Sequence, residues 1–186
     1  ATGANSTTTA DAQEDLVSGA ALVLTTTEGG ITVNGGTATA ATGVNAAGNI
    51  LLSTGETIEP TVADIALNAS VISSGGNISL ISADGITQAA AGDITASGAG
   101  KTIDVKAYGA IAMADGAVTG SASGNIRYEA VAGNIALGEL NAGGGDISLV
   151  ATSGSVTDAD AGAGNDVTAD ELRIVVGGNV GSVTDA

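Results

Sequence analysis

The chain has 186 residues, enough for one domain, and its 20 acidic and four basic residues give a net charge of −16. This balance excludes nucleic acid and anionic membrane surfaces as partners, because both require a basic binding surface. The absence of cysteine excludes disulfides and thiol chemistry, and no apolar run is long enough for membrane insertion.

The first 20 residues differ from the rest of the chain. They are rich in Thr, Ser and Asp and contain the only candidate helical turn, Ala10 to Val17. We interpret residues 1–20 as an N-terminal arm or cap, and residues 21–186 as a repeat domain. Because residue 1 is Ala and no signal peptide is present, we interpret the chain as a processed protein or as a piece of a longer one.

From residue 21 onward one short pattern recurs without a linker. Two apolar residues separated by one residue begin each unit, and a second apolar position follows the first by eight or nine residues. Such alternation is typical of a strand with one buried face. The first and second positions are Leu22 and Ile31, Ile50 and Ile58, Ile78 and Ile86, Ile103 and Ile111, Ile126 and Ile135, Ile147 and Val156, and Leu172 and Val180.

A third apolar position follows in most units and predicts a third strand per unit. The last unit fits two registers, because Ile174 with Val183 matches the pattern as well as Leu172 with Val180. The third positions are Ile65 with Leu67, Ile94, Val118, Leu140 and Val167.

Strands this short cannot bury an apolar face alone, whereas stacked coils pair each strand with neighbours above and below. The sequence therefore predicts an all-β fold, a right-handed parallel β-helix (β-solenoid) of about seven coils with three short strands each. At about 4.8 Å per coil, seven coils make a rod about 34 Å long.

The expected corners of the coils carry Gly followed by Asn or Asp. Both residue types tolerate positive φ, so we expect them to let the chain turn tightly once per coil. These pairs are Gly48-Asn49, Gly76-Asn77, Gly124-Asn125, Gly133-Asn134, Gly145-Asp146 and Gly178-Asn179.

The outward positions of the first strand carry three of the four basic residues. In the register set by apolar spacing, Asp104 lies opposite Arg127 and Lys106 opposite Glu129, and such pairs contribute about 0.2–1 kcal/mol each. One outward column is Leu51, Ser79, Asp104, Arg127, Ser148 and Arg173, and the next is Ser53, Ile81, Lys106, Glu129, Val150 and Val175.

One acidic stretch near the C-terminus is the only cluster of oxygen ligands, which are the ligands calcium prefers. Its spacing matches neither an EF-hand loop nor the glycine-rich nonapeptide of calcium-binding β-rolls. A solvated acidic turn is therefore the preferred interpretation, and no cofactor is expected. The calcium candidates that remain are Asp158, Asp160, Asn165 and Asp166.

No set of residues fills the roles of a catalytic site. A polysaccharide lyase or hydrolase needs paired carboxylates with aromatic platforms or a basic partner, and this chain has no His and only two aromatic residues. We therefore expect no enzyme activity and assign no catalytic residues.

The repeat units resemble those of filamentous-haemagglutinin-like adhesins and related β-strand-repeat surface exoproteins of bacteria. The resemblance lies in units such as GNISLISADGITQAAAGDITASG, GGDISLVATSGSVTDA and ELRIVVGGNVGS, and it extends over residues 21–186. It implies a right-handed β-helix, export to the cell surface or medium, and a role in adhesion or in building an extracellular layer or fibre.

Two functions follow as alternatives. The preferred one is a non-enzymatic structural segment that forms a rod or a self-assembling extracellular filament or layer, through the coil ends or a flat face. The other is an adhesin module that binds glycan or a host receptor through an outward face of the solenoid. A building block should self-associate, whereas a binding module should stay monomeric and carry an exposed patch on one column.

Overall fold

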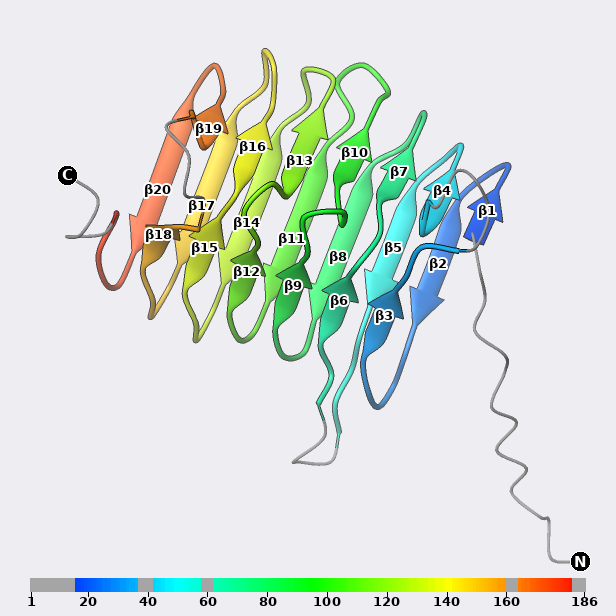
Figure 1. The fold of residues 1–186 in the computed structure, drawn as a ribbon, viewed down its shortest axis with the longest axis horizontal. Helices are drawn as coiled ribbons and strands as arrows, with labels where there is room; N and C mark the ends of the chain where they lie inside the picture. The colour runs from blue at the N-terminus through cyan, green and yellow to red at the C-terminus, as the bar shows by residue number, and fades with distance from the viewer. Residues whose placement is uncertain (1–15, 37–41, 58–61, 160–163, 182–186) are drawn as a thin grey trace, which may run out of the picture.

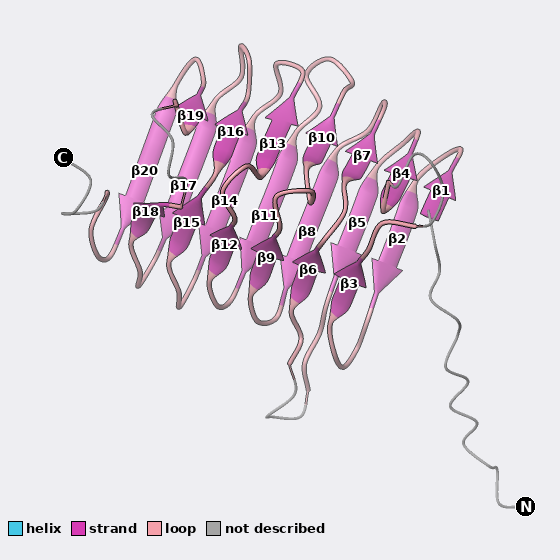
Figure 2. Cartoon of the chain, in the orientation of Figure 1, coloured by secondary structure: helices cyan, strands magenta, loops and turns pink. Residues whose placement is uncertain are grey.

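The computed structural model describes residues 16–36, 42–57, 62–159 and 164–181. These residues contain twenty strands and no helix (Figure 1, Figure 2). All strand pairs are parallel, and consecutive strands of the chain belong to different sheets, so each coil adds one strand to each of three sheets. The fold is the expected right-handed parallel β-helix, with sheets of seven, seven and six strands.

We name the sheets by the order in which the repeat pattern enters them. The first sheet is β2 (Leu22–Thr25), β5 (Ile50–Ser53), β8 (Ile78–Ser82), β11 (Ile103–Ala107), β14 (Ile126–Ala130), β17 (Ile147–Ala151) and β20 (Leu172–Val176). The second sheet is β3 (Ile31–Val33), β6 (Ile65–Leu67), β9 (Ile86–Gln88), β12 (Ile111–Met113), β15 (Ile135–Leu137) and β18 (Val156–Asp158). The third sheet is β1 (Leu16–Ser18), β4 (Val44–Ala46), β7 (Val71–Ser73), β10 (Ile94–Ala96), β13 (Val118–Ser121), β16 (Glu139–Asn141) and β19 (Val167–Thr168).

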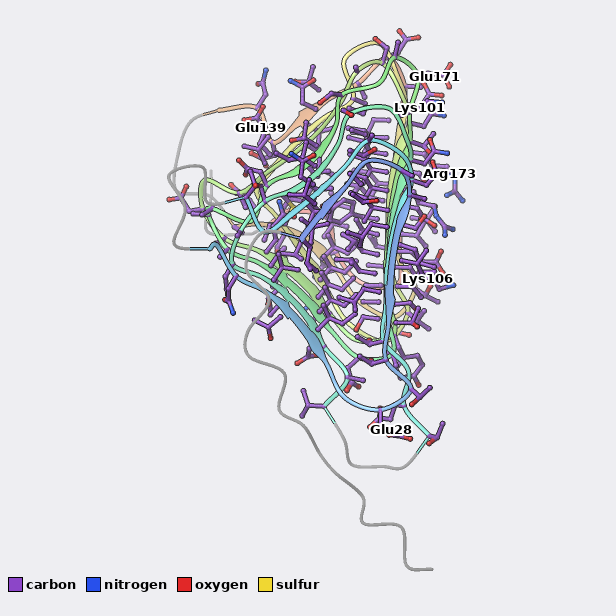
Figure 3. All side chains as sticks on the ribbon, turned by 90° about the vertical axis from the view of Figure 1, so that its right-hand side faces the viewer. Glu28, Lys101, Lys106, Glu139, Glu171 and Arg173 are labelled. Carbon is purple, nitrogen blue, oxygen red and sulfur yellow. The ribbon has the colours of Figure 1, made fainter. Side chains whose placement is uncertain are left out.

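The core is a stack of small and branched apolar side chains inside the three sheets. Seen along the solenoid axis, the first sheet forms one flat side and the side chains of all three sheets fill the space between them (Figure 3). Every inward position of the first sheet from β5 to β17 is buried, while the outward positions between them are at least partly exposed. This alternation is the period of two from which the strands were predicted.

The corners that precede the strands of the first sheet are joined by a ladder of asparagine side chains. The Asn49 side-chain oxygen accepts the N–H of Asn77 at 2.9 Å, and that of Asn77 accepts the N–H of Thr102 at 3.0 Å. One corner further round the coil, the Asn134 side chain accepts the N–H of Ser155 at 2.9 Å. Each bond links one coil to the next, so the ladder stabilises the stack.

The glycines of the Gly-Asn and Gly-Asp pairs have a different role from the one expected. None of the six has a positive φ. Instead, a Cβ on Gly76 or Gly124 would overlap backbone atoms of the preceding coil, and one on Gly145 would lie 2.5 Å from the Gly124 carbonyl oxygen. Glycine is required there because successive coils approach too closely for any side chain.

The second coil differs from the prediction because it contains an insertion. The strand that follows β5 in the second sheet is β6, whose Ile65 pairs with Ile31 and Ile86, so Ile65 and Leu67 do not form the third strand. The third-sheet strand of this coil is β7. The predicted second position, Ile58, lies outside the described residues.

Buried hydroxyl groups stabilise the base of this insertion. The Thr54 hydroxyl donates to the Ala63 carbonyl oxygen, and the Ser82 hydroxyl donates to the same oxygen at 2.8 Å. Asp84 accepts the N–H of Ala63 at 2.7 Å, and Asp64 accepts the N–H of Gly85 at 2.7 Å. These bonds return the chain to the coil after a segment too long for the repeat.

The third-sheet strand β13 is shifted by one residue from the prediction. Thr119, not Val118, lies in register with Ile94 and Leu140, and Thr119 is fully buried. Its hydroxyl lies 2.7 Å from the Tyr128 hydroxyl and 3.3 Å from the Gln88 side-chain oxygen. A polar residue occupies an inward position here because two other buried polar side chains satisfy it.

Burial makes Tyr128 a source of alkaline instability. Removal from water raises the pKa of its hydroxyl above the ordinary value of 10, although the bond to Thr119 opposes the shift. Above pH 10 the tyrosine hydroxyl ionises in the unfolded state while it stays protonated in the folded state. The contribution of the buried Tyr128 hydroxyl to stability is therefore complete below pH 10 and is lost as the pH rises further. We expect the free energy of unfolding of the wild type to fall above pH 10, by up to about 1.4 kcal/mol per pH unit, relative to Tyr128→Phe. Urea titrations of both proteins at pH 8 to 11 measure this, and parallel pH profiles would contradict it.

The structure also shows where the described solenoid begins and which of the two predicted registers the last coil has. The solenoid begins before residue 21, because β1 pairs with β4 through Leu16 and Val44. Val17, which was expected in a helical turn, lies in this strand, and residues 1–15 lie outside the described part. In the last coil Leu172 pairs with Ile147, and Val180 forms a bridge with Val156, which selects the first of the two registers.

Candidate functional site

The outer face of the first sheet has the register expected from apolar spacing. Asp104 pairs in register with Arg127, and Lys106 with Glu129. Both outward columns continue without a slip from β5 to β20. The structure therefore confirms both outward columns, and Figure 3 places Lys106 and Arg173 on this face and Glu139 on the far side.

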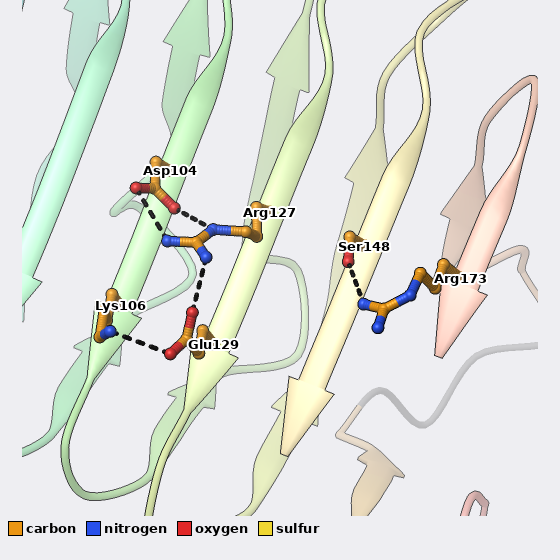
Figure 4. Close-up of polar contacts among 6 residues, drawn as sticks. All are labelled: Asp104, Lys106, Arg127, Glu129, Ser148 and Arg173. Carbon is orange, nitrogen blue, oxygen red and sulfur yellow. Dashed lines mark hydrogen bonds and ion pairs between the residues drawn. The ribbon is translucent and has the colours of Figure 1, made fainter. Parts of the chain in front are cut away.

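A charged cluster occupies the middle of this face (Figure 4). The Arg127 Nε lies 2.7 Å from an Asp104 oxygen, and its other guanidinium edge lies 2.6 Å from Glu129. Glu129 also contacts the Lys106 ammonium at 2.9 Å. The hydrogen bond that Arg127 donates to Asp104 and the charges of both acids raise the pKa of Arg127, against the opposing effect of burial.

This cluster fixes the charge pattern of the surface and contributes little to stability. The Lys106 and Arg127 side chains are 42% and 45% exposed, so water and salt screen their ion pairs. We expect a double-mutant cycle with Lys106→Met and Glu129→Gln to give a coupling energy below about 1 kcal/mol that shrinks further in 1 M salt. A coupling above about 2 kcal/mol, measured by denaturant unfolding, would show that the pair is effectively desolvated.

Arg173 is the one residue of the outward columns with a cationic group that no acid neutralises. Its guanidinium lies 3.3 Å from the Ser148 hydroxyl, and no carboxylate of the described residues lies within ion-pair distance of it. Ser148 is short and lies between Arg127 and Arg173 (Figure 4). The result is a shallow depression of about 400 Å³, and its polar lining residues are Asn125, Arg127, Asp146, Ser148, Glu171 and Arg173.

The described residues show no metal centre. Asp158 ends β18, and Asn165 and Asp166 precede β19, while Asp160 lies outside the described residues. Within residues 16–36, 42–57, 62–159 and 164–181, no group of three or more His, Cys, Asp or Glu side chains is placed to hold a metal ion. Calcium binding by this stretch stays a prediction.

The two ends of the solenoid form a second kind of candidate site. In the described part of the chain, the strands of the first coil pair only toward the C-terminus, and those of the last coil only toward the N-terminus. Exposed large apolar side chains gather at these ends. Eight such residues are exposed in the described structure, and five lie in the first or last coil: Val17, Val23, Leu172, Val175 and Val180.

The sequence pattern did not identify either the depression or this gathering of apolar residues at the ends. A signal for the depression was present, because a serine stands between two arginines in one outward column. The exposure of Leu172 had no such signal, because Leu172 belongs to an apolar alternation that indicates a core position. Val17 was expected in a helical turn of the N-terminal arm and not in a strand.

Comparisons with known proteins leave the family open, since no family model, curated protein or solved structure matches the chain. The resemblance to filamentous-haemagglutinin-like exoproteins therefore stays a prediction from the repeat style. A search of the described residues for a helix long and apolar enough to cross a membrane finds none.

Proposed function

We propose that the chain is a non-enzymatic structural segment of an exported bacterial surface protein, which forms a rod and self-assembles into an extracellular filament or layer. The observation that carries this proposal is the pair of sheet edges. Three parallel ladders run through the described coils, and among the described residues the strands of the first and last coils pair on one side only. An exposed strand edge is a template for pairing with another chain.

Export to the cell surface rests on the resemblance of the repeats. The absence of cysteine does not fix the compartment. A rod of this kind needs no catalytic group, and its outer face carries ion pairs that are already satisfied internally.

Net charge sets the conditions under which assembly occurs. Each copy carries −16, so copies repel at low ionic strength, where the screening length is about 30 Å at 0.01 M salt. At 0.5 to 1 M salt this length falls to a few ångströms, and short-range edge pairing then dominates. We expect the sedimentation coefficient at a fixed protein concentration to rise with salt or with millimolar calcium.

Sedimentation velocity between 0.01 and 1 M sodium chloride tests this proposal. Sodium chloride promotes assembly only by screening the repulsion between copies. A specific effect of calcium would instead change assembly when calcium is added at constant ionic strength. A single monomeric species under every condition would reject self-assembly.

The alternative function is an adhesin module that binds glycan or a host receptor. The observation that favours it is the depression around Ser148, where Arg173 offers a guanidinium without an acidic partner beside several sugar-compatible polar groups. Such a module would stay monomeric and bind a glycan on an array, and Arg173→Met would abolish that binding while Lys101→Met would not.

A further inference from the structure

We infer that copies of this chain pair head to tail through the first sheet, with β2 of one copy in register on β20 of another and Leu22 opposite Leu172. This inference rests on the proposed self-assembly and adds its contact surface and its register. The partner is a second copy of the chain, and the contact continues the ladder that already joins the coils.

The direction of the backbone hydrogen bonds supports this pairing. In each described coil of the first sheet, the N–H of the inward residue that starts the strand donates to the following coil. Leu22 donates to the Asn49 oxygen at 2.8 Å, and Ile147 donates to the Glu171 oxygen at 2.9 Å. By the same geometry the Leu172 N–H points away from β17, toward the space where a further coil would lie. On β2 the Val23 N–H points away from β5 in the opposite direction.

The other two sheets fit the same placement. The first described coil runs from the third sheet (β1) through the first sheet to the second (β3), and the last described coil runs from β19 through β20 to the bridge at Val180. Both coils therefore pass through the three sheets in the same order and from the same starting sheet. Setting β2 on β20 also sets Leu16 over Val167 and Ile31 over Val180, which are the inward positions of their sheets.

Side chains at the junction match in kind as well as in position. The inward columns place Leu22 over Leu172 and Leu24 over Ile174, which are less buried than the same columns inside the solenoid. The contact covers the inward-column residues that are exposed at the end, Leu172 and Val180, which are 49% and 58% exposed, and one side of the outward Val23, which is 66% exposed. A contact between different surfaces of identical copies produces a ring if the rotation between copies closes and a filament if it does not. Here the copies stack along the solenoid axis, so the contact does not close and produces a filament.

The outward column supplies a test that is specific for this register. In the junction Arg173 of one copy lies directly opposite Val23 of the next, as Arg127 lies opposite Asp104 inside the solenoid. A carboxylate at position 23 would therefore meet an arginine that has no acidic partner, and a lysine there would meet a like charge. Cross-strand pairs of this kind contribute up to about 1 kcal/mol, or about a fivefold change in an equilibrium constant.

Net charge alone predicts the opposite order. Val23→Glu makes a chain of net charge −16 more negative, and Val23→Lys makes it less negative. If only general repulsion mattered, the lysine variant would assemble at lower concentration. Head-to-tail pairing instead predicts that Val23→Glu lowers the critical concentration about two- to fivefold and that Val23→Lys raises it by a similar factor. The critical concentration of the double variant Val23→Lys with Arg173→Glu should return toward that of the wild type. It should do so although the double variant has a more negative net charge than Val23→Lys alone.

The experiment measures critical concentrations of the five proteins, wild type, Val23→Thr, Val23→Glu, Val23→Lys and the double variant, by sedimentation at about 0.15 M salt. Val23→Thr is the neutral control, and thermal unfolding of each protein checks that it is folded. If the wild type assembles but the lysine variant assembles best, or if the double variant is not restored, the head-to-tail register is wrong and self-assembly stands. If the wild type forms no assembly at any salt concentration, both proposals are rejected.

Discussion

Alanine in place of Gly124 is expected to destabilise the solenoid by about 3 kcal/mol or more, which is enough to unfold a domain of ordinary stability. A Cβ at this position would overlap the carbonyl oxygen and carbon of Lys101 in the preceding coil. Both atoms are backbone, and Ile103, two residues later, is held by its N–H bond to the Asn125 oxygen at 3.0 Å. The strain therefore cannot be relieved by a change of rotamer and must separate two coils.

Gly120→Ala is the matched control for this experiment. Gly120 lies in β13 of the same stack, and the nearest atom to its Cβ would be the Asn141 carbonyl oxygen at 3.9 Å, an ordinary contact. We expect Gly120→Ala to change the free energy of unfolding by less than about 1 kcal/mol. Denaturant unfolding of both variants measures the difference. Equal stabilities would mean that the coils do not approach as closely as the structure shows.

Tyr128→Ala is expected to cost about 3–5 kcal/mol, the range for removing a large buried aromatic side chain. Tyr128 is fully buried, and its ring takes the inward position that Leu80 and Leu149 occupy in other coils. Its hydroxyl also contacts Thr119 at 2.7 Å and Gln88 at 3.2 Å, so truncation leaves both a cavity and unsatisfied polar groups.

The second tyrosine of the chain provides the control for Tyr128. Tyr108 is 60% exposed at a corner, and Tyr108→Ala should change stability by less than about 0.5 kcal/mol. Tyr128→Phe should lie between the two, near 1 kcal/mol, because it removes the hydroxyl and keeps the ring. A loss below 1 kcal/mol for Tyr128→Ala in denaturant unfolding would contradict a packed interior at this coil.

The first sheet was predictable residue by residue because its strands are the longest and its coils lack insertions within the strand. All seven first positions, from Leu22 to Leu172, begin the observed strands. The charge pairs Asp104 with Arg127 and Lys106 with Glu129 followed from that register, since one slip would have turned these side chains into the core.

The second and third sheets were less predictable because their strands are shorter. Ile58 has the spacing expected for the second strand, and nothing in the sequence showed that the coil is interrupted before Ile65. The inward position of Thr119 was not predicted, because a threonine within an apolar alternation is expected to face outward. Its partner Gln88 also lies 31 residues away in the chain. Only the stacking of two coils reveals that these polar groups satisfy each other.

The candidate site was only partly predictable for the same reason. The outward columns identified the charged face, including Arg173 at its end. The depression beside Ser148 and the N–H of Leu172, which points away from β17, depend on where the described strands stop, which is a property of the whole stack rather than of any one repeat.

Electron microscopy of the purified chain in 0.5 M salt, with and without millimolar calcium, shows whether the chain assembles by itself. We expect filaments one solenoid wide, with an axial repeat of about 34 Å for seven coils at about 4.8 Å each. Filaments that require calcium would point to the acidic stretch from Asp158. Isolated rods of that length at every salt concentration would contradict the claim that this chain is a self-assembling building block.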